Sequence, residues 1–318
     1  MTKNQIINSI INSIRNHKDY AEKLRDNNLG LAMQSEDFRA LELEKRALMQ
    51  EIALDDFNGK SVIIKQKRFD EINKQLKLIT KKMKLQPYDA IYNCPICKDS
   101  GYYNGELCVC AKSMLFNKLK ALSGIDNKLS YTFEMHNNDL FLGTKQELKV
   151  KKLIPYLMDY SVTFPQVKFN NLILSGGTGT GKTFALSALG NSLINKGNFV
   201  LYLTAFDMHN AFLNYHIAPI NEKSIFLENI LNADLLIIDD LGTEPIFKNV
   251  TLEYLYLTIS ERTLNNLPIC ISTNLSPDQL LNRYGERIFS RLTDKRKSRL
   301  INIDGDDIRR RIIKDNIN

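Results

Sequence analysis

The residues best suited to chemistry form a glycine-rich loop in the second half of the chain. The eight residues of this loop are Gly176, Gly177, Thr178, Gly179, Thr180, Gly181, Lys182 and Thr183. This is the pattern of a phosphate-binding P-loop, in which glycines let backbone N–H groups turn inward around phosphates. We expect Lys182 to reach the β- and γ-phosphates of a nucleoside triphosphate and Thr183 to ligate its Mg²⁺ ion. A glycine-rich turn that only reverses the chain is the alternative.

The sequence on either side supports the P-loop interpretation. An apolar run, Leu172–Ser175, leads straight into the loop, and Phe184–Leu193 continues as a helix. A strand, a loop and a helix in this order are what the motif requires, and they place the phosphates at a helix N-terminus. The expected ligand is therefore ATP with Mg²⁺.

Two further apolar runs end in polar residues. Leu235–Asp239 is followed by Asp240, and Ile269–Thr273 is followed by Asn274. Ligands of open α/β sheets bind at the C-terminal ends of the strands. We therefore expect Asp239 on the magnesium side, and Asp240 as the group that orients or deprotonates the attacking water. Asn274 can hydrogen-bond the γ-phosphate and that water, although an asparagine after a strand more often forms a turn.

Four of the five cysteines crowd into one short segment, at positions Cys94, Cys97, Cys108 and Cys110. Zinc favours four thiolates in a tetrahedron, and two cysteines separated by two residues commonly present a pair of them. This spacing predicts a structural zinc site without an open coordination position. The single residue between Cys108 and Cys110 departs from the usual spacing, and a redox pair is the competing interpretation.

The elements that must position these groups differ between the two halves of the chain. In the first ninety residues, apolar side chains recur at steps of three and four over Phe38–Ile52 and Phe69–Met83, which predicts two helices packed as an antiparallel hairpin. Ser35 can cap the first helix, Asn58 and Gly59 separate the two, and Pro87 is expected to end the second. The apolar stripes of these two helices could form part of a surface that binds a partner protein, or they could be plain helical core.

From about residue 150 the pattern changes to helices that alternate with short apolar runs. The five expected strands are Leu172–Ser175, Phe199–Thr204, Leu235–Asp239, Ile269–Thr273 and Leu300–Ile303. Continuous apolar strands between helices predict an α/β fold with a parallel five-stranded sheet covered on both faces. The resulting layout is a helical, zinc-binding domain over 1–112, a linker over 113–150, and a nucleotide-binding domain over 151–318.

Composition restricts the class of protein. The chain has 318 residues, of which 43% are hydrophobic and 25% charged, as in a soluble globular protein of two domains. No apolar run is long enough to span a bilayer and no secretion signal is recognisable, so we expect a cytoplasmic protein without a membrane partner. Residues 283–314 hold eleven basic and five acidic residues. They favour phosphate-bearing partners, or form a solvated surface.

Together these motifs resemble AAA+ ATPases, and specifically bacterial replicative-helicase loaders of the DnaC/DnaI type. The matching segments are Gly176–Thr183, Ile238–Gly242, Ser272–Asn274, Tyr284–Leu292, Gly305–Arg309 and, in the first half, Cys94–Tyr102. The resemblance places Asn274 at the sensor-1 position and Arg309 at the sensor-2 position, where it contacts phosphate in its own subunit. It also places Arg291 at the arginine finger, which acts on ATP held by a neighbouring subunit. A surface ion pair is the alternative for each arginine.

The resemblance also implies a function. Such loaders hold a hexameric replicative helicase through the N-terminal domain and deliver it onto single-stranded DNA in replication initiation or restart. They self-assemble through the AAA+ domain, and slow ATP hydrolysis governs release. An extra helix at Thr204–Tyr215 would face DNA, although core packing is the more common role of its aromatic residues. A helper ATPase of a transposition system is one alternative, and a nucleotide-gated adaptor with negligible hydrolysis is another.

Overall fold

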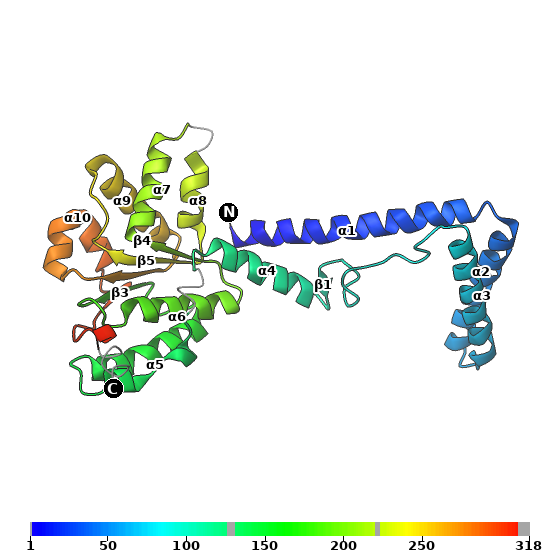
Figure 1. The fold of residues 1–318 in the computed structure, drawn as a ribbon, viewed down its shortest axis with the longest axis horizontal. Coiled ribbons are helices and arrows are strands. Elements are labelled where there is room, and N and C mark those ends of the chain that lie inside the picture. Colours follow the sequence, from blue (N-terminus) through cyan, green and yellow to red (C-terminus); the bar gives the residue numbers. More distant parts are fainter. Residues whose placement is uncertain (1, 126–130, 220–222, 311–318) are drawn as a thin grey trace. The chain divides into compact units, whose positions relative to one another are not determined.

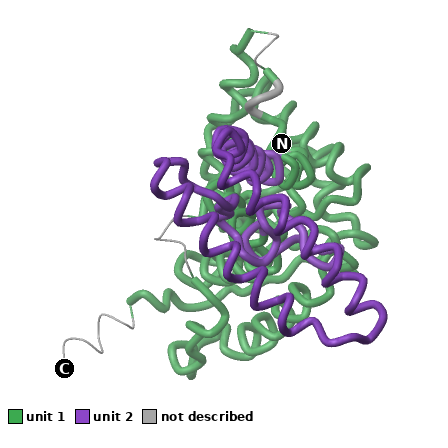
Figure 2. The backbone as a smooth tube through the Cα atoms, turned by 90° about the vertical axis from the view of Figure 1, so that its right-hand side faces the viewer, with its two compact units in different colours: residues 1–8, 112–318 green, residues 9–111 purple. Residues whose placement is uncertain are grey.

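The computed structural model describes residues 2–125, 131–219 and 223–310 of the chain. The chain forms two compact units, which Figure 2 distinguishes by colour. The helical unit is Ser9–Ala111, and the sheet unit combines Met1–Asn8 with Lys112–Asn318. Residues 113–150, expected to form a linker, fall within the sheet unit.

Three helices dominate the helical unit: α1 (Lys3–Ala32), which starts in the sheet unit, α2 (Glu36–Phe57) and α3 (Ile63–Lys82). The expected hairpin of α2 and α3 is confirmed (Figure 1), and its core contains the completely buried Ala32, Phe38, Ile72 and Leu76. The Ser35 hydroxyl accepts a hydrogen bond from the Phe38 N–H at 3.5 Å, so Ser35 caps α2 as expected.

Helix α3 ends differently from the expectation. Its last residue is Lys82, and Lys84 then adopts a left-handed conformation with φ of +57°. The N–H of Leu85 donates to the Thr80 carbonyl at 2.9 Å, which satisfies the end of the helix. The chain has therefore already left the helix before Pro87, and the assignment of the stop to that proline is wrong.

The sheet unit is built on five strands: β3 (Asn171–Ser175), β4 (Val200–Thr204), β5 (Leu235–Leu241), β6 (Ile269–Thr273) and β7 (Ser298–Asn302). All pair in parallel, in the spatial order β4-β5-β6-β3-β7. The five expected strands are confirmed, although the last begins at Ser298 instead of Leu300. Every residue of β3 and β6 is buried, as expected for strands covered on both faces.

Helices cover both faces of this sheet (Figure 1). Helices α5 (Glu147–Thr163) and α6 (Lys182–Asn195) lie on one face. Helices α7 (Ala205–Ile217), α8 (Lys223–Asn232) and α9 (Glu253–Leu264) lie on the other. After β6 comes α10 (Pro277–Leu292), which packs against α9, and α4 (Val109–Leu122) leads from the cysteine segment into the sheet unit. Among the described helices, none has the length and apolar character to cross a membrane.

The strand order determines where functional groups can meet. Strand β3 lies between β6 and β7, and Ser175 at its end pairs in register with Thr273 and Asn302. Because all strands run in parallel, the loops that follow β3, β5, β6 and β7 leave the sheet at one edge. The P-loop therefore opens beside the segments that follow the other strands.

The hairpin core yields a stability prediction. We expect Leu76→Ala to lower the free energy of unfolding by about 2–5 kcal/mol, because Leu76 is completely buried between α2 and α3. Denaturant unfolding monitored by circular dichroism would measure this loss. Leu78, two residues along α3 and 58% exposed, is the matched control, and Leu78→Ala should cost less than about 0.5 kcal/mol. Equal losses in the two variants would contradict the hairpin packing.

Candidate functional site

The P-loop follows β3 directly and has a backbone that requires glycine at defined positions. Gly176, Gly179 and Gly181 have φ of +149°, +72° and +97°, a region that L side chains rarely adopt. A Cβ at Gly176 would lie 2.9 Å from the carbonyl carbon of Ile303, and one at Gly179 would overlap the Asp307 carboxylate. Glycine is therefore needed both for the turn itself and for the segment packed against it.

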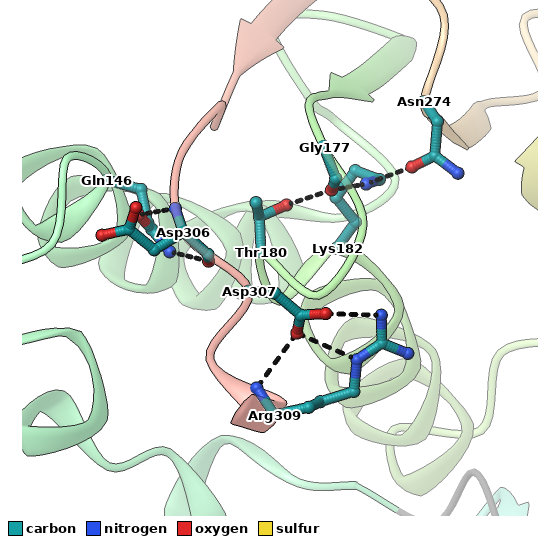
Figure 3. A network of polar contacts seen from close by, with 8 residues as sticks. All are labelled: Gln146, Gly177, Thr180, Lys182, Asn274, Asp306, Asp307 and Arg309. Carbon is teal, nitrogen blue, oxygen red and sulfur yellow. Dashed lines mark hydrogen bonds and ion pairs between the residues drawn. The ribbon is translucent and has the colours of Figure 1, made fainter. Parts of the chain in front are cut away.

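Lys182 is the first residue of α6, and only 5% of it is exposed. Its Nζ donates a hydrogen bond of 2.7 Å to the Gly176 carbonyl. It also donates bonds of 2.7 Å to the Gly177 carbonyl and to Oδ1 of Asn274 (Figure 3). Burial lowers the pKa of Lys182, while the nearby Asp240 and Asp239 oppose that shift. The structure thus joins the predicted lysine to the predicted asparagine, which follows a different strand.

Asp239 is a buried carboxylate in β5 that accepts hydrogen bonds from three hydroxyl groups. The donors are the Tyr202 hydroxyl at 2.7 Å, the Thr183 hydroxyl at 3.2 Å, and the Ser272 hydroxyl. These contacts come from β4, α6 and β6, so the carboxylate has a defined orientation beside the start of α6. Thr183 and Asp239 are the two predicted magnesium ligands, and their direct contact matches that pairing.

Asp240 differs from its neighbour, because its side chain faces the cavity. Its backbone is left-handed, with φ of +56°, and its N–H donates to the Ser272 hydroxyl at 2.8 Å. Burial and the adjacent Asp239 raise the pKa of Asp240, whereas Lys182 and Arg309 lower it. A carboxylate whose proton affinity is raised in this way is suited to general-base chemistry.

These side chains line one cavity of about 480 Å³. Its wall includes the P-loop from Thr178 to Thr183, with Asp240, Asn274 and Arg309. Asp239 is not part of the cavity wall, but it accepts a hydrogen bond from Thr183, which is. The structure therefore assembles the predicted P-loop, acidic and amide groups around a single space.

One wall of the cavity was missed by sequence reasoning, because it falls in the expected linker. It consists of Tyr131, Met135, His136, Asn137, Leu140 and Phe141. The His136 ring lies 5.8 Å from that of Phe141 and 5.9 Å from that of Phe184 on α6. An apolar, aromatic wall beside a phosphate loop is suited to hold a flat nucleobase. The aromatic residues of this otherwise polar stretch were the available signal.

Arg309 reaches the cavity from the segment that follows β7. Its side chain is 62% exposed and pairs with Asp307, with Nε 3.1 Å from Oδ1 (Figure 3). The N–H of Ile308 donates to the Gly179 carbonyl at 3.0 Å, which ties this segment to the P-loop. The expected position of Arg309 beside bound phosphate in its own subunit is compatible with this geometry.

Arg291 is not among the residues that line this cavity. It lies on α10, where its Nη2 donates to the Tyr256 hydroxyl at 2.9 Å. The guanidinium of Arg287 stacks 3.9 Å from the centre of the same ring. The two arginines lower the pKa of Tyr256 to about 8, through hydrogen bonds from Arg287 and then Arg291. The expected action of Arg291 on ATP held by a neighbouring subunit stays a prediction.

The four clustered cysteines converge in the helical unit, with all four sulfur atoms within 4.8 Å of one another. The Sγ atoms of Cys94 and Cys108 are 3.8 Å apart, and those of Cys97 and Cys110 are 3.6 Å apart. Four thiolates about 2.3 Å from a zinc ion would be separated by about 3.8 Å in a regular tetrahedron. The thiols therefore fit a metal ion of that size.

The chain between the cysteine pairs explains this convergence. Strands β1 (Tyr102–Tyr103) and β2 (Glu106–Leu107) form a small antiparallel hairpin, with Gly101 and Gly105 both at φ of +80°. Cys110 falls in the first turn of α4. The backbone N–H of Cys97, followed by that of Ile96, lowers the pKa of Cys94 to about 7, whereas burial and the neighbouring thiols raise the pKa of Cys110.

The expected DNA-facing features have mixed outcomes. The predicted helix at Thr204–Tyr215 is present as α7, but Phe212 is completely buried and packs in the core, so it cannot stack a base. Phe206 on the same helix is 54% exposed. In the basic segment, Arg296 pairs with Asp294 at 2.9 Å. Arg311 and Lys314 of that segment lie outside the described residues.

The fold and the cavity define a class of protein. A P-loop after β3, an acidic end on β5 and a polar residue after the intervening β6 form a P-loop nucleotide-binding domain. A family model described as IstB-like ATP binding protein matches residues 151–315. The chain belongs to this family of IstB-like ATP-binding proteins.

Three relatives show the range of the similarity. The chain is 32% identical over 124 residues to the protein YdaV of Escherichia coli (strain K12), covering 39% of this chain and 49% of YdaV. It is 28% identical over 218 residues to the phage-like element PBSX protein XkdC of Bacillus subtilis (strain 168), covering 64% and 80%. It is 28% identical over 124 residues to the replicative helicase loader DnaC of Escherichia coli (strain K12), covering 38% and 49%. The matched region thus spans about half the length of YdaV and of DnaC.

Proposed function

We propose that this protein is an ATP-dependent loader that delivers a replicative DNA helicase onto single-stranded DNA in replication initiation or restart. The observation that carries the proposal is the convergence of Lys182, Asp240, Asn274 and Arg309 on one cavity, since these groups can distinguish ATP from its product. The similarity to DnaC, a replicative helicase loader, supports the cargo. We place the protein in the cytoplasm, where such a helicase works.

Each residue of the cavity has a role in this proposal. Lys182 exchanges its bonds to the loop carbonyls for bonds to the β- and γ-phosphates. Thr183 and Asp239 would hold Mg²⁺, and that ion would supply positive charge beside the phosphates. Asp240 accepts a proton from the attacking water, and Asn274 orients that water. The aromatic wall around His136 receives the adenine base.

The role proposed for Arg291 requires that copies of the chain assemble. Arg287 and Arg291 of α10 are exposed and share Tyr256 of α9, so they can enter the cavity of an adjoining copy of the chain. A guanidinium that approaches the γ-phosphate stabilises the charge that develops during transfer. We propose that the sheet units self-assemble and that hydrolysis is slow outside the assembly.

Two other functions share this ATP-binding domain. A helper ATPase of a transposition system is favoured by the family match, which carries the IstB name. An adaptor gated by nucleotide binding, with negligible hydrolysis, would use the same cavity. The helical unit with its four thiols precedes the ATP-binding domain in the sequence. It favours the loader, because it provides a separate surface for a cargo protein.

The nucleotide site is tested by two substitutions. We expect Lys182→Ala to weaken ATP binding by about 100-fold or more, because the phosphates lose a buried cation. Asp240→Asn should leave binding within about threefold but slow hydrolysis by roughly 100-fold, because the amide cannot accept the proton. Binding is measured with a fluorescent ATP analogue, and hydrolysis by phosphate release.

Lys196→Ala is the matched control, since it removes a lysine at the other end of α6. It should bind and hydrolyse ATP like the unaltered chain. Unchanged turnover in Asp240→Asn would remove Asp240 from the proton-accepting role. If Lys182→Ala binds ATP normally, the P-loop is not the nucleotide site.

We propose that the cysteine cluster holds one structural Zn²⁺. Metal analysis of freshly purified protein should find about one zinc per chain, and Cys97→Ser should lose it because a tetrahedral site then lacks a ligand. Cys270→Ala is the control, because Cys270 is buried in β6 of the sheet unit and should leave the zinc content unchanged. Protein that contains no zinc, or zinc that survives Cys97→Ser, would contradict the proposal.

The cargo is tested by co-purification with the replicative helicase of the same organism in the presence of ATP and Mg²⁺. The full chain should form a complex, and a chain lacking residues 1–112 should not, because the helical unit provides the contact. Retained ATP binding by the shortened chain is the control that its sheet unit is intact. If the full chain binds ATP but no helicase, the loader function fails and the transposition helper becomes the better hypothesis.

A further inference from the structure

A buried glutamine far from Arg309 in the sequence holds the backbone that carries this arginine. Gln146 immediately precedes α5 and is completely buried. Its Nε2 donates to the Asp306 carbonyl at 2.7 Å, and its Oε1 accepts from the Asp306 N–H at 2.9 Å (Figure 3). A side-chain amide that bonds both polar groups of one residue imitates the pairing of a neighbouring β-strand.

The Gln146 side chain leaves no space for a side chain at position 305. A Cβ at Gly305 would lie 1.9 Å from the Gln146 Oε1 and 2.5 Å from its Cδ. Gly305 can therefore be only glycine while Gln146 stands in this place. The hydrogen bonds between Gln146 and Asp306 therefore depend on the absence of a side chain at Gly305.

Gln146 provides one of three tethers that join the segment Asp304–Arg310, which we call the strap, to parts of the chain distant in the sequence. The Asp304 carboxylate accepts from the Gly177 N–H at 3.1 Å, and the Ile308 N–H donates to the Gly179 carbonyl at 3.0 Å. Counting Asp306, alternate residues of the strap are held, two by the P-loop and one by Gln146. The next residue after the last tether is Arg309, whose side chain lines the cavity.

The tethers at Asp304 and Ile308 are not sufficient to position Arg309. Both join the strap to the P-loop, which must itself accommodate the phosphates when nucleotide binds. Gln146 belongs instead to the start of α5, a long helix that packs on α6 and the sheet unit's core. It supplies a fixed reference that is independent of the loop.

We propose that Gln146 is a positioning residue that places Arg309 for recognition of the terminal phosphate of ATP, and so determines the preference for ATP over ADP. The inference rests on the proposed function, because it takes Arg309 as the phosphate contact within its own subunit. Gln146 is not among the residues that line the cavity. It acts only through the backbone of the strap.

The test compares the dissociation constants of ATPγS and ADP, with Mg²⁺, for the full chain and its variants. We expect Gln146→Ala to weaken ATPγS binding by about tenfold and to change ADP binding by less than about twofold, because a charge-assisted phosphate contact is lost. Arg309→Ala should show the same selective loss. The double variant should be no weaker than Arg309→Ala alone, because the glutamine acts through the arginine.

Two controls separate positioning from general damage. Lys145→Ala changes the exposed neighbour of Gln146 and should leave both dissociation constants unchanged. Gln146→Glu keeps the size of the side chain and an acceptor for the Asp306 N–H, but its ionised carboxylate cannot donate to the Asp306 carbonyl. It should therefore show the same selective loss of ATPγS, and it remains a test if the alanine variant does not fold.

Amide hydrogen exchange of the unaltered chain provides a measurement that needs no variant. The amides of Asp306 and Ile308 should exchange slowly, because each is held by a tether. Free exchange at Asp306, equal loss of ATPγS and ADP binding, unchanged ATPγS binding, or additive effects in the double variant would each overturn the role of Gln146 alone. If the unaltered chain binds neither nucleotide, the proposed function fails and the role of Gln146 fails with it.

Discussion

The site depends on the pairing of β3 between β6 and β7. This interior position places the P-loop between two other strand ends. Lys182 therefore contacts Asn274 on one side, and Gly177 and Gly179 of the loop contact the strap that carries Arg309 on the other. The acidic end of β5 lies one strand further out, and its Asp239 is connected back to the start of α6 by the Thr183 hydroxyl. Parallel pairing is what brings these loops to one edge, since every strand then ends on the same side.

Within that arrangement, two adjacent carboxylates have different environments and therefore different uses. Asp239 accepts hydrogen bonds from hydroxyls of three elements, which orients a buried anion and favours a metal-binding role. Asp240 has a left-handed backbone that turns it toward the cavity, where burial and Asp239 raise its pKa. Two neighbouring acids of the same type can have different chemical roles when their environments differ in this way.

The two halves of the chain are stabilised by different means. In the sheet unit, completely buried strands and the helices on both faces provide a large apolar core. In the helical unit, the α2–α3 hairpin has a small core, and the cysteine segment has only a short hairpin between its thiol pairs. A segment with so little apolar packing is where a metal ion contributes most to folding, since four ligands can replace the missing core.

The sequence by itself determined the features that depend on local residue order. The glycine spacing of the P-loop, the five apolar strands and the two stripes of the hairpin follow from backbone conformation and side-chain period, and the structure contains them. Tertiary structure alone decided the contacts between distant segments: the aromatic wall at 131–141, the Gln146 contact with Asp306, and the Tyr256 stack of Arg287 and Arg291. No local period marks such residues, because each is placed by the packing of elements that the chain order does not make neighbours.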